Sequence, residues 1–214
     1  MKDILQEIGS NLYNGEVKKV SDLVRDALKG GIAPKDILSD GLIAGMDKVG
    51  KDFKAGYLFV PEVLRTASAM VAGMEILRPL LIQGDGSFGT DKCIIGTVKG
   101  DLHDIGKNLV KMMLEGAGFE VIDLGTDVSP EAFVAATRQH QPKVLAMSAM
   151  LTTTMSNMRA TIEALSISGL RDSIKVMIGG APVTGAFATQ IGADAFAPDA
   201  ANAVDIARNL FNVV

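Results

Sequence analysis

Several residue types that build common functional sites are scarce in this sequence. Its 214 residues include one cysteine, two histidines, two tyrosines and no tryptophan. The single cysteine, Cys93, can form neither an intrachain disulfide nor a thiolate metal site by itself, which fits a reducing compartment. The shortage of Trp and Tyr argues against a surface that grips sugars or stacks on bases.

Long apolar runs and clusters of like charge are also absent. The longest strongly apolar stretch spans Val144 to Leu151, well short of the ~20 residues that a membrane-spanning helix needs. The start, Met1-Lys2-Asp3, does not resemble a signal peptide. The formal net charge is −4 and 48% of the residues are hydrophobic, which excludes disorder and gives no basic patch for phosphates. We therefore expect a cytoplasmic protein that binds neither membrane nor nucleic acid.

Residues 1–83 have the periodicity of helices. Apolar residues recur at helical spacing over 17–28, Gly30-Gly31 ends that run, and Pro34 and Pro61 stand where first-turn prolines begin later helices. The sequence therefore predicts a four-helix unit. Residues 84–90 contain three glycines, which is typical of a flexible linker.

From residue 91 onward, short apolar runs alternate with segments of helical period. The runs begin near Cys93, Glu120, Lys143, Lys175 and Ala195. The first four lack polar alternation, including Val121-Ile122, which is typical of parallel strands buried on both faces. Ligands of such sheets bind beyond the carboxyl ends of the strands, so we expect the site in the loops 100–106, 125–130, 148–154 and 179–184.

The first of these loops contains one of the two histidines, His103. Its glycines do not have the dinucleotide-binding spacing, which makes a flavodoxin-like nucleotide binder a distant alternative. No second His or Cys is near in sequence, so a protein-built zinc site is disfavoured. A lone His suits a metal already held by a macrocycle, with Asp101 accepting its other ring N–H. The alternative is that both residues belong to a turn or helix cap.

Two later loops have features that are ambiguous when taken separately. The loop 148–154 has four hydroxyl side chains, of which a helix cap needs only one. Gly179-Gly180 either admits a ligand against the backbone or forms a tight turn. The other histidine, His140, lies at a polar helix end, and we assign it no function.

Taken together, the motifs Asp101-x-His103-x-x-Gly106, Ser148-x-Met150 and Gly179-Gly180 resemble the cobalamin-binding module of methionine synthase. Over essentially the whole chain, the sequence is similar to the small corrinoid proteins of methylamine, betaine and methoxy-aromatic methyltransferase systems. The resemblance implies an α/β fold: an N-terminal four-helix bundle cap (1–83), a linker (84–90) and a Rossmann-like (flavodoxin-like) five-stranded parallel-sheet cobalamin-binding domain (91–214). Met150 departs from the family pattern, which has Leu there.

The resemblance also implies roles for individual residues. His103 would be the axial ligand of cobalt, Asp101 its hydrogen-bond partner, and Thr154 the hydroxyl that continues this relay. Phe53 and Val60 would lie over the upper face of the corrin. The residues implied to contact the corrinoid are Gly100, Asp101, Leu102, His103, Asp104, Ile105, Gly106, Ser148, Met150, Thr152, Thr154, Gly179, Gly180, Phe53 and Val60.

The function implied by the resemblance is methyl carriage. Co(I) would accept a methyl group from a donor-specific methyltransferase, and methyl-Co(III) would pass it to a second methyltransferase whose acceptor is tetrahydrofolate or a thiol coenzyme. A reductive activase is a further expected partner. The chain would thus be a carrier component and not a complete enzyme. Two alternatives are the cobalamin subunit of an adenosylcobalamin isomerase, which would lack the helical cap, and a cobalamin-sensing regulator, which would need a signalling domain.

Overall fold

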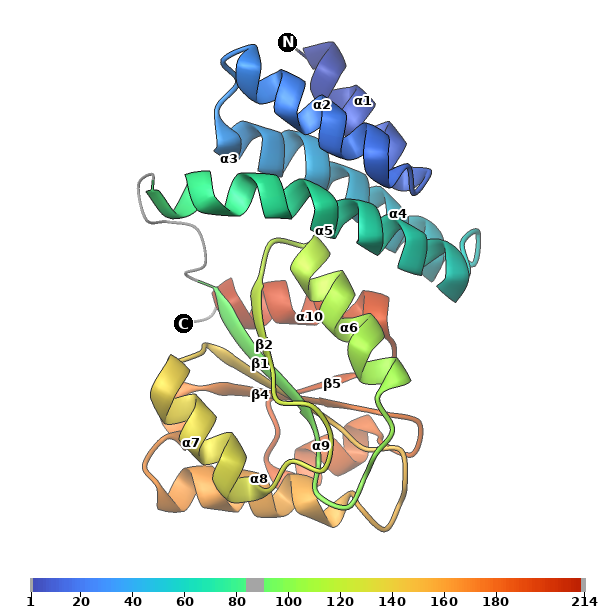
Figure 1. Cartoon of the computed structure of the whole chain (residues 1–214). Coiled ribbons are helices and arrows are strands. Elements are labelled where there is room, and N and C mark those ends of the chain that lie inside the picture. The colour runs from blue at the N-terminus through green and yellow to red at the C-terminus, as the bar shows by residue number, and fades with distance from the viewer. Residues whose placement is uncertain (1, 84–90, 213–214) are drawn as a thin grey trace. The chain divides into compact units, whose positions relative to one another are not determined.

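The computed structural model describes residues 2–83 and 91–212, which fall into two compact units (Figure 1). One unit is helical and the other contains the sheet. The predicted linker, 84–90, lies outside the described residues. The domain boundaries therefore stay a prediction.

Four helical runs make up residues 2–83, as predicted. They are α1 (Lys2–Tyr13), α2 (Val17–Lys29), a continuous run of α3 (Pro34–Asp36), η1 (Ile37–Ile43) and α4 (Ala44–Lys54), and α5 (Val60–Gln83). Pro34 stands in the first turn of α3, and Gly30 caps the carboxyl end of α2. Within the described parts of the chain, no helix combines the length and the apolar character needed to cross a bilayer.

The segment η1 is a π-helix, which the apolar periodicity did not predict. It lies where α1 packs closely on the third helical run. A Cβ on Gly45 would lie 3.0 Å from the Cα of Gly9, and one on Gly41 would lie 3.2 Å from Ile8 Cγ2. Glycine at these positions therefore lets the helices approach one another, a requirement that the local sequence pattern does not reveal.

The second unit is a five-stranded parallel sheet in the order β2-β1-β3-β4-β5, with helices on both faces. Helices α7, α8 and α9 cover one face, and α6 and α10 cover the other (Figure 1). The strand prediction is confirmed, and the order is that of flavodoxin-like folds. The elements are β1 (Lys92–Thr97), α6 (Ile105–Gly116), β2 (Glu120–Asp123), α7 (Pro130–His140), β3 (Val144–Ser148), α8 (Ser156–Ile167), η2 (Arg171–Ser173), β4 (Lys175–Gly179), α9 (Gly185–Ile191), β5 (Ala195–Ala197) and α10 (Ala200–Asn212).

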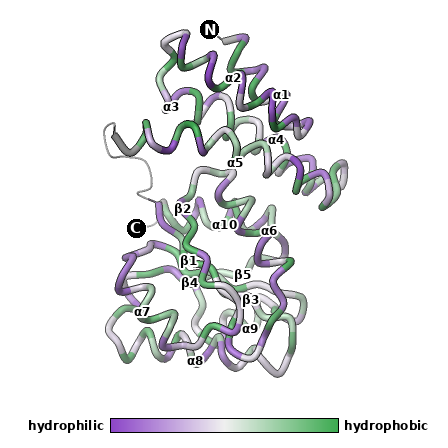
Figure 2. The backbone as a smooth tube through the Cα atoms, viewed as in Figure 1, coloured by the Kyte–Doolittle hydropathy of each residue, from purple (hydrophilic) through white to green (hydrophobic). Residues whose placement is uncertain are grey.

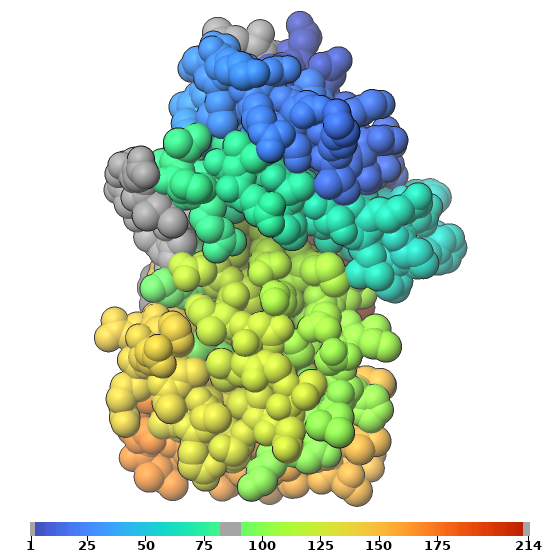
Figure 3. Space-filling model, in the orientation of Figure 1, coloured from blue at the N-terminus to red at the C-terminus, as the bar shows by residue number. Residues whose placement is uncertain are grey.

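The central strands form the core of this unit. Ile94 and Leu145 are completely buried, and the tube of Figure 2 is green, the hydrophobic end of the scale, in the middle of β1. The expectation that Val121-Ile122 would be buried on both faces is wrong, because β2 is an edge strand and its residues are only half-buried. In the space-filling view, the yellow-green region that contains α6 and β2 is exposed at the visible surface of this unit (Figure 3).

Candidate functional site

Three of the four predicted loops leave the sheet at the same level. Thr97 at the end of β1 pairs with Ser148 at the end of β3, and Ser148 pairs with Gly179 at the end of β4. The strand order reverses between β1 and β3, and ligands of such sheets bind at this switch point. The register thus brings together the segments that contain the three motifs.

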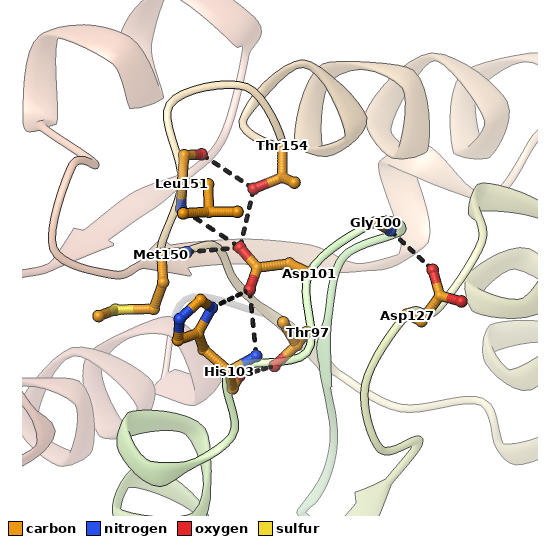
Figure 4. Close-up of polar contacts among 8 residues, drawn as sticks. All are labelled: Thr97, Gly100, Asp101, His103, Asp127, Met150, Leu151 and Thr154. Carbon is orange, nitrogen blue, oxygen red and sulfur yellow. Dashed lines mark hydrogen bonds and ion pairs between the residues drawn. The ribbon is translucent and has the colours of Figure 1, made fainter.

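The carboxylate of Asp101 joins two of these loops (Figure 4). Its Oδ1 accepts hydrogen bonds from His103 Nδ1 at 2.7 Å and from the His103 backbone N–H at 3.1 Å. Its Oδ2 accepts from the backbone N–H groups of Met150 at 2.8 Å and Leu151 at 3.3 Å, and from Thr154 Oγ1 at 2.8 Å. One buried side chain therefore fixes the β1–α6 loop and the β3–α8 loop to each other.

These hydrogen bonds also set the charge of Asp101. Burial by itself would raise its pKa, but the hydrogen bonds from Met150, His103 and Thr154 outweigh burial and hold the pKa well below its usual range. An ionised carboxylate only accepts, so the proton of a neutral His103 ring lies on Nδ1 and Nε2 presents its lone pair. The backbone of His103 is held as well, because the hydroxyl of Thr97 donates to its carbonyl at 2.9 Å.

The imidazole of His103 is accessible and lies among exposed apolar side chains. Its side chain is 54% exposed, whereas that of Asp101 is fully buried. The neighbouring Leu102 and Ile105 are 74% and 80% exposed, and Met150 and Leu151 from the facing loop are 41% and 43% exposed. Exposed apolar side chains grouped in this way mark a binding surface. A flat, largely apolar ligand would suit such a surface, and the role of His103 as the ligand of its metal stays a prediction.

The glycines predicted to make room for the corrinoid fall into two classes. A Cβ on Gly180, whose φ is +126°, would lie 1.9 Å from the carbonyl oxygen of Ala149, so the fold itself requires glycine there. A Cβ on Gly106 would meet nothing within 4 Å, which leaves open space beside the start of α6. Ser148 is half-buried and Thr152 is exposed. The contacts of these residues with the corrinoid stay predictions.

The remaining predicted site residues are spread more widely. Gly100 lies in the β1–α6 loop with φ +80°, and Asp104 accepts a hydrogen bond from Asn108 Nδ2 at 3.1 Å. Phe53, at the end of α4, is half-buried, and Val60, at the start of α5, is 38% exposed. Both belong to the helical unit, and their contact with the upper corrin face stays a prediction.

Some functional groups were missed by sequence reasoning. The N–H groups of Met150 and Leu151 bind Asp101, and no residue type signals a backbone donor. Thr97 and Asp127 hold the β1–α6 loop; the only signal for them was their position, Thr97 at the end of a strand and Asp127 within a predicted ligand loop. Among the residues that the structure describes, no group of three or more His, Cys, Asp or Glu is placed to hold a metal ion.

Comparison with known proteins shows the family. A B12 binding domain model matches residues 91–207, and a second B12 binding domain model matches residues 4–78. The chain is 43% identical over 209 residues to dimethylamine corrinoid protein 1 of Methanosarcina acetivorans, covering 98% of each chain. It is 39% identical over 210 residues to trimethylamine corrinoid protein 1 of the same organism, covering 97% of this chain and 96% of the relative.

Solved structures agree with these relatives. The methanol:cobalamin methyltransferase complex of Methanosarcina barkeri matches with a TM-score of 0.89 and 30% identity, covering 99% of this chain and 81% of that chain. A cobalamin-binding protein of Desulfitobacterium hafniense matches with a TM-score of 0.80 and 32% identity, covering 96% of this chain and 98% of that chain. The chain therefore belongs to the B12-binding family of methyltransferase cognate corrinoid proteins, and the cofactor that it binds is cobalamin or a closely related corrinoid.

Proposed function

We propose that this protein carries a methyl group on its corrinoid from a methylamine-specific methyltransferase to a second methyltransferase. Support for the donor comes from the relatives, since those 39–43% identical over nearly the whole chain are dimethylamine and trimethylamine corrinoid proteins. A second methyltransferase, which would take the methyl group from the corrinoid, completes the proposed transfer. The bound corrinoid supplies the cobalt atom that accepts and releases the methyl group.

The observation that carries the proposal is the chain of hydrogen bonds Thr154–Asp101–His103. Asp101 holds the proton of His103 on Nδ1, which leaves Nε2 as a donor for a metal. The backbone N–H of His103 donates to the same oxygen at 3.1 Å, so Asp101 Oδ1 fixes both the tautomer and the position of the ring. A ring held in this way suits the proposed role as an axial ligand of the corrinoid metal.

The hydroxyl of Thr154 adds a second adjustable contact. Its Oγ1 lies 2.8 Å from Asp101 Oδ2 and 2.9 Å from the carbonyl oxygen of Leu151, and its one proton serves one of these acceptors at a time. While Asp101 is ionised, the charge-assisted hydrogen bond is the stronger of the two. Thr154 therefore stabilises the ionised state of Asp101 without touching the metal.

Reconstitution with cobalamin tests the role of His103. The wild type is expected to bind about one cobalamin per chain with the cofactor's own benzimidazole off the metal and one protein nitrogen on it, seen by absorption and electron paramagnetic resonance (EPR). His103→Ala should retain the corrinoid but lose the nitrogen signal. His140→Ala, at the carboxyl end of α7, is the matched control and should behave like the wild type. A nitrogen signal that survives in His103→Ala would overturn the assignment.

A panel of methyl donors tests the proposed specificity. The corrinoid-loaded protein would be offered methyltransferases specific for monomethylamine, dimethylamine, trimethylamine, betaine, methanol or a methoxy-aromatic compound, each with its donor. Transfer of isotopically labelled methyl groups to this protein should be fastest with one of the three methylamines. Faster transfer from methanol, betaine or a methoxy-aromatic donor would contradict the proposed donor and leave corrinoid binding unaffected.

A further inference from the structure

The β1–α6 loop, which contains Asp101 and His103, is held by one residue of the neighbouring β2–α7 loop. Oδ1 of Asp127 accepts a hydrogen bond from the backbone N–H of Gly100 at 2.7 Å (Figure 4). The backbone N–H of Asp127 donates to the carbonyl oxygen of Asp101 at 3.0 Å. Asp127 thus contacts the two residues that lead into the His103 turn, although it does not contact His103 itself.

Asp127 makes these contacts in a backbone conformation that few residues adopt. Its φ is +55°, and in the described parts of the chain Gln141 is the other non-glycine residue with positive φ. Asp and Asn tolerate this region better than most side chains. Hydrogen bonds on both sides impose it, since Thr97 N–H donates to Gly125 O and Val128 N–H donates to Thr97 O, each at 3.0 Å. These bonds extend the β1–β2 pairing past the ends of the strands and place residue 127 over the Gly100–Asp101 turn.

We propose that Asp127 is a positioning residue for the axial ligand, and this inference rests on the proposed role of His103. Asp101 is held at two points, its carbonyl by Asp127 and its carboxylate by the β3–α8 loop. His103 in turn takes its ring orientation from that carboxylate. Loosening the Gly100–Asp101 turn changes the direction in which the carboxylate meets Nδ1. Asp127 therefore sets the geometry of the ligand through Asp101.

Three substitutions test the proposed role of Asp127. Asp127→Gly removes the acceptor for Gly100 N–H and relieves the positive φ. Asp127→Asn keeps an oxygen acceptor and tolerates the same φ. Gln141→Gly relieves a φ of +48° at the exposed carboxyl end of α7 and serves as the matched control. Thermal unfolding of all three verifies that each variant folds.

The measurements use the protein with and without cobalamin. In the loaded protein, EPR gives the ratio of nitrogen-ligated to unligated cobalt; in the free protein, the ring 15N shifts of His103 report the share of the Nδ1–H form. Asp127→Gly should lower the ligation ratio about two- to tenfold, as expected for the loss of one hydrogen bond, and should reduce the Nδ1–H share. Asp127→Asn and Gln141→Gly should match the wild type.

Equal ligation ratios and ring shifts in Asp127→Gly and the wild type would overturn the inference. So would an equal change in Gln141→Gly, because that would trace the effect to general backbone relaxation. If the wild type itself showed no nitrogen on cobalt, the proposed function would fail instead. The ring shifts of the cobalamin-free protein would then still decide whether Asp127 positions His103.

Discussion

Nδ1 of His103 lies 2.7 Å from Oδ1 of Asp101, and this hydrogen bond joins a half-exposed ring to a wholly buried carboxylate. The two residues therefore respond differently to substitution. Asp101 belongs to the hydrogen-bond network that holds two loops together, whereas the accessible Nε2 of His103 remains available for a ligand. Variants of Asp101 should change both folding and corrinoid binding, while variants of His103 should change mainly the ligation of cobalt.

Replacing Asp101 with Asn should weaken the site in both respects. One oxygen can still accept from His103, but the amide NH₂ cannot accept from Met150 N–H or Thr154 Oγ1. Leaving these donors without their acceptor should lower the free energy of unfolding by about 1–3 kcal/mol. Loss of a ligand's hydrogen-bond partner typically costs 10–100-fold in metal affinity or activity. Urea unfolding and cobalamin titration measure the two effects, and unchanged values in both would contradict the network described for Asp101.

Replacing Thr154 with Val tests the outer end of the same network. The side chain is nearly the same size and the position is buried, so the main change is loss of the hydroxyl that donates to Asp101. We expect a loss of about 1 kcal/mol in unfolding free energy and a smaller nitrogen-ligated fraction of cobalt. Thr153→Val, at the adjacent exposed position, is the control. Equal effects of the two substitutions would show that the Thr154 hydroxyl has no special role.

A buried ion pair next to the His103 loop should make stability depend on pH. Nζ of Lys107 in α6 lies 2.7 and 2.8 Å from the carboxylate oxygens of Asp123 in β2, and its side chain is 2% exposed. Burial by itself would raise the pKa of Asp123. The hydrogen bonds from Lys107 and Gly125 outweigh burial and hold the pKa below its usual value. A lowered folded-state pKa adds stability above the unfolded pKa of about 3.9, and this stability is lost as the pH falls below that value.

Removing one member of this pair should therefore be costly. Asp123→Ala leaves the buried ammonium of Lys107 with Asn108 Oδ1 at 2.7 Å as its remaining partner in that network, and we expect a loss of about 3 kcal/mol at pH 7. The difference in unfolding free energy between the wild type and Asp123→Ala should shrink between pH 5 and pH 3, which is roughly the range over which such carboxylates titrate. Urea unfolding at each pH measures this difference. Asp22→Ala removes an exposed partner of Lys18 and should change stability by less than about 1 kcal/mol. Similar losses in both variants would contradict the buried pair's role.

Local patterns in the sequence predicted the fold well, because each central strand is a short run without polar alternation. The half-burial of Val121 and Ile122 was not predictable in this way, since it depends on β2 lying at the sheet edge. The π-helical segment likewise depends on the approach of α1 at Gly9 and Gly45. The local sequence does not show which helix or strand will pack beside a given segment, and both features depend on that neighbour.

The same limit applies to the candidate site. Asp101 and His103 were predicted as partners because a single residue separates them, and their hydrogen bond is present. Met150 was predicted to contact the corrinoid, and the structure adds its backbone N–H as a donor to Asp101. Asp127 acquires its contacts only when β1 and β2 pair beyond their ends. The chemistry of the side chains was thus predictable from the sequence, and the backbone contacts between loops were not.

The apolar side chains around His103 should contribute to cofactor binding and little to folding. Leu102 and Ile105 are 74% and 80% exposed, so Leu102→Ser and Ile105→Ser should change the unfolding free energy by no more than about 0.5 kcal/mol. If the corrin covers these side chains, each substitution forfeits about 1–2 kcal/mol of apolar burial and weakens cobalamin binding roughly five- to thirtyfold. Ile167→Ser, 88% exposed at the end of α8, is the matched control and should leave binding unchanged. Cobalamin affinity that is equal in all three variants and the wild type would show that the corrin does not rest on this surface.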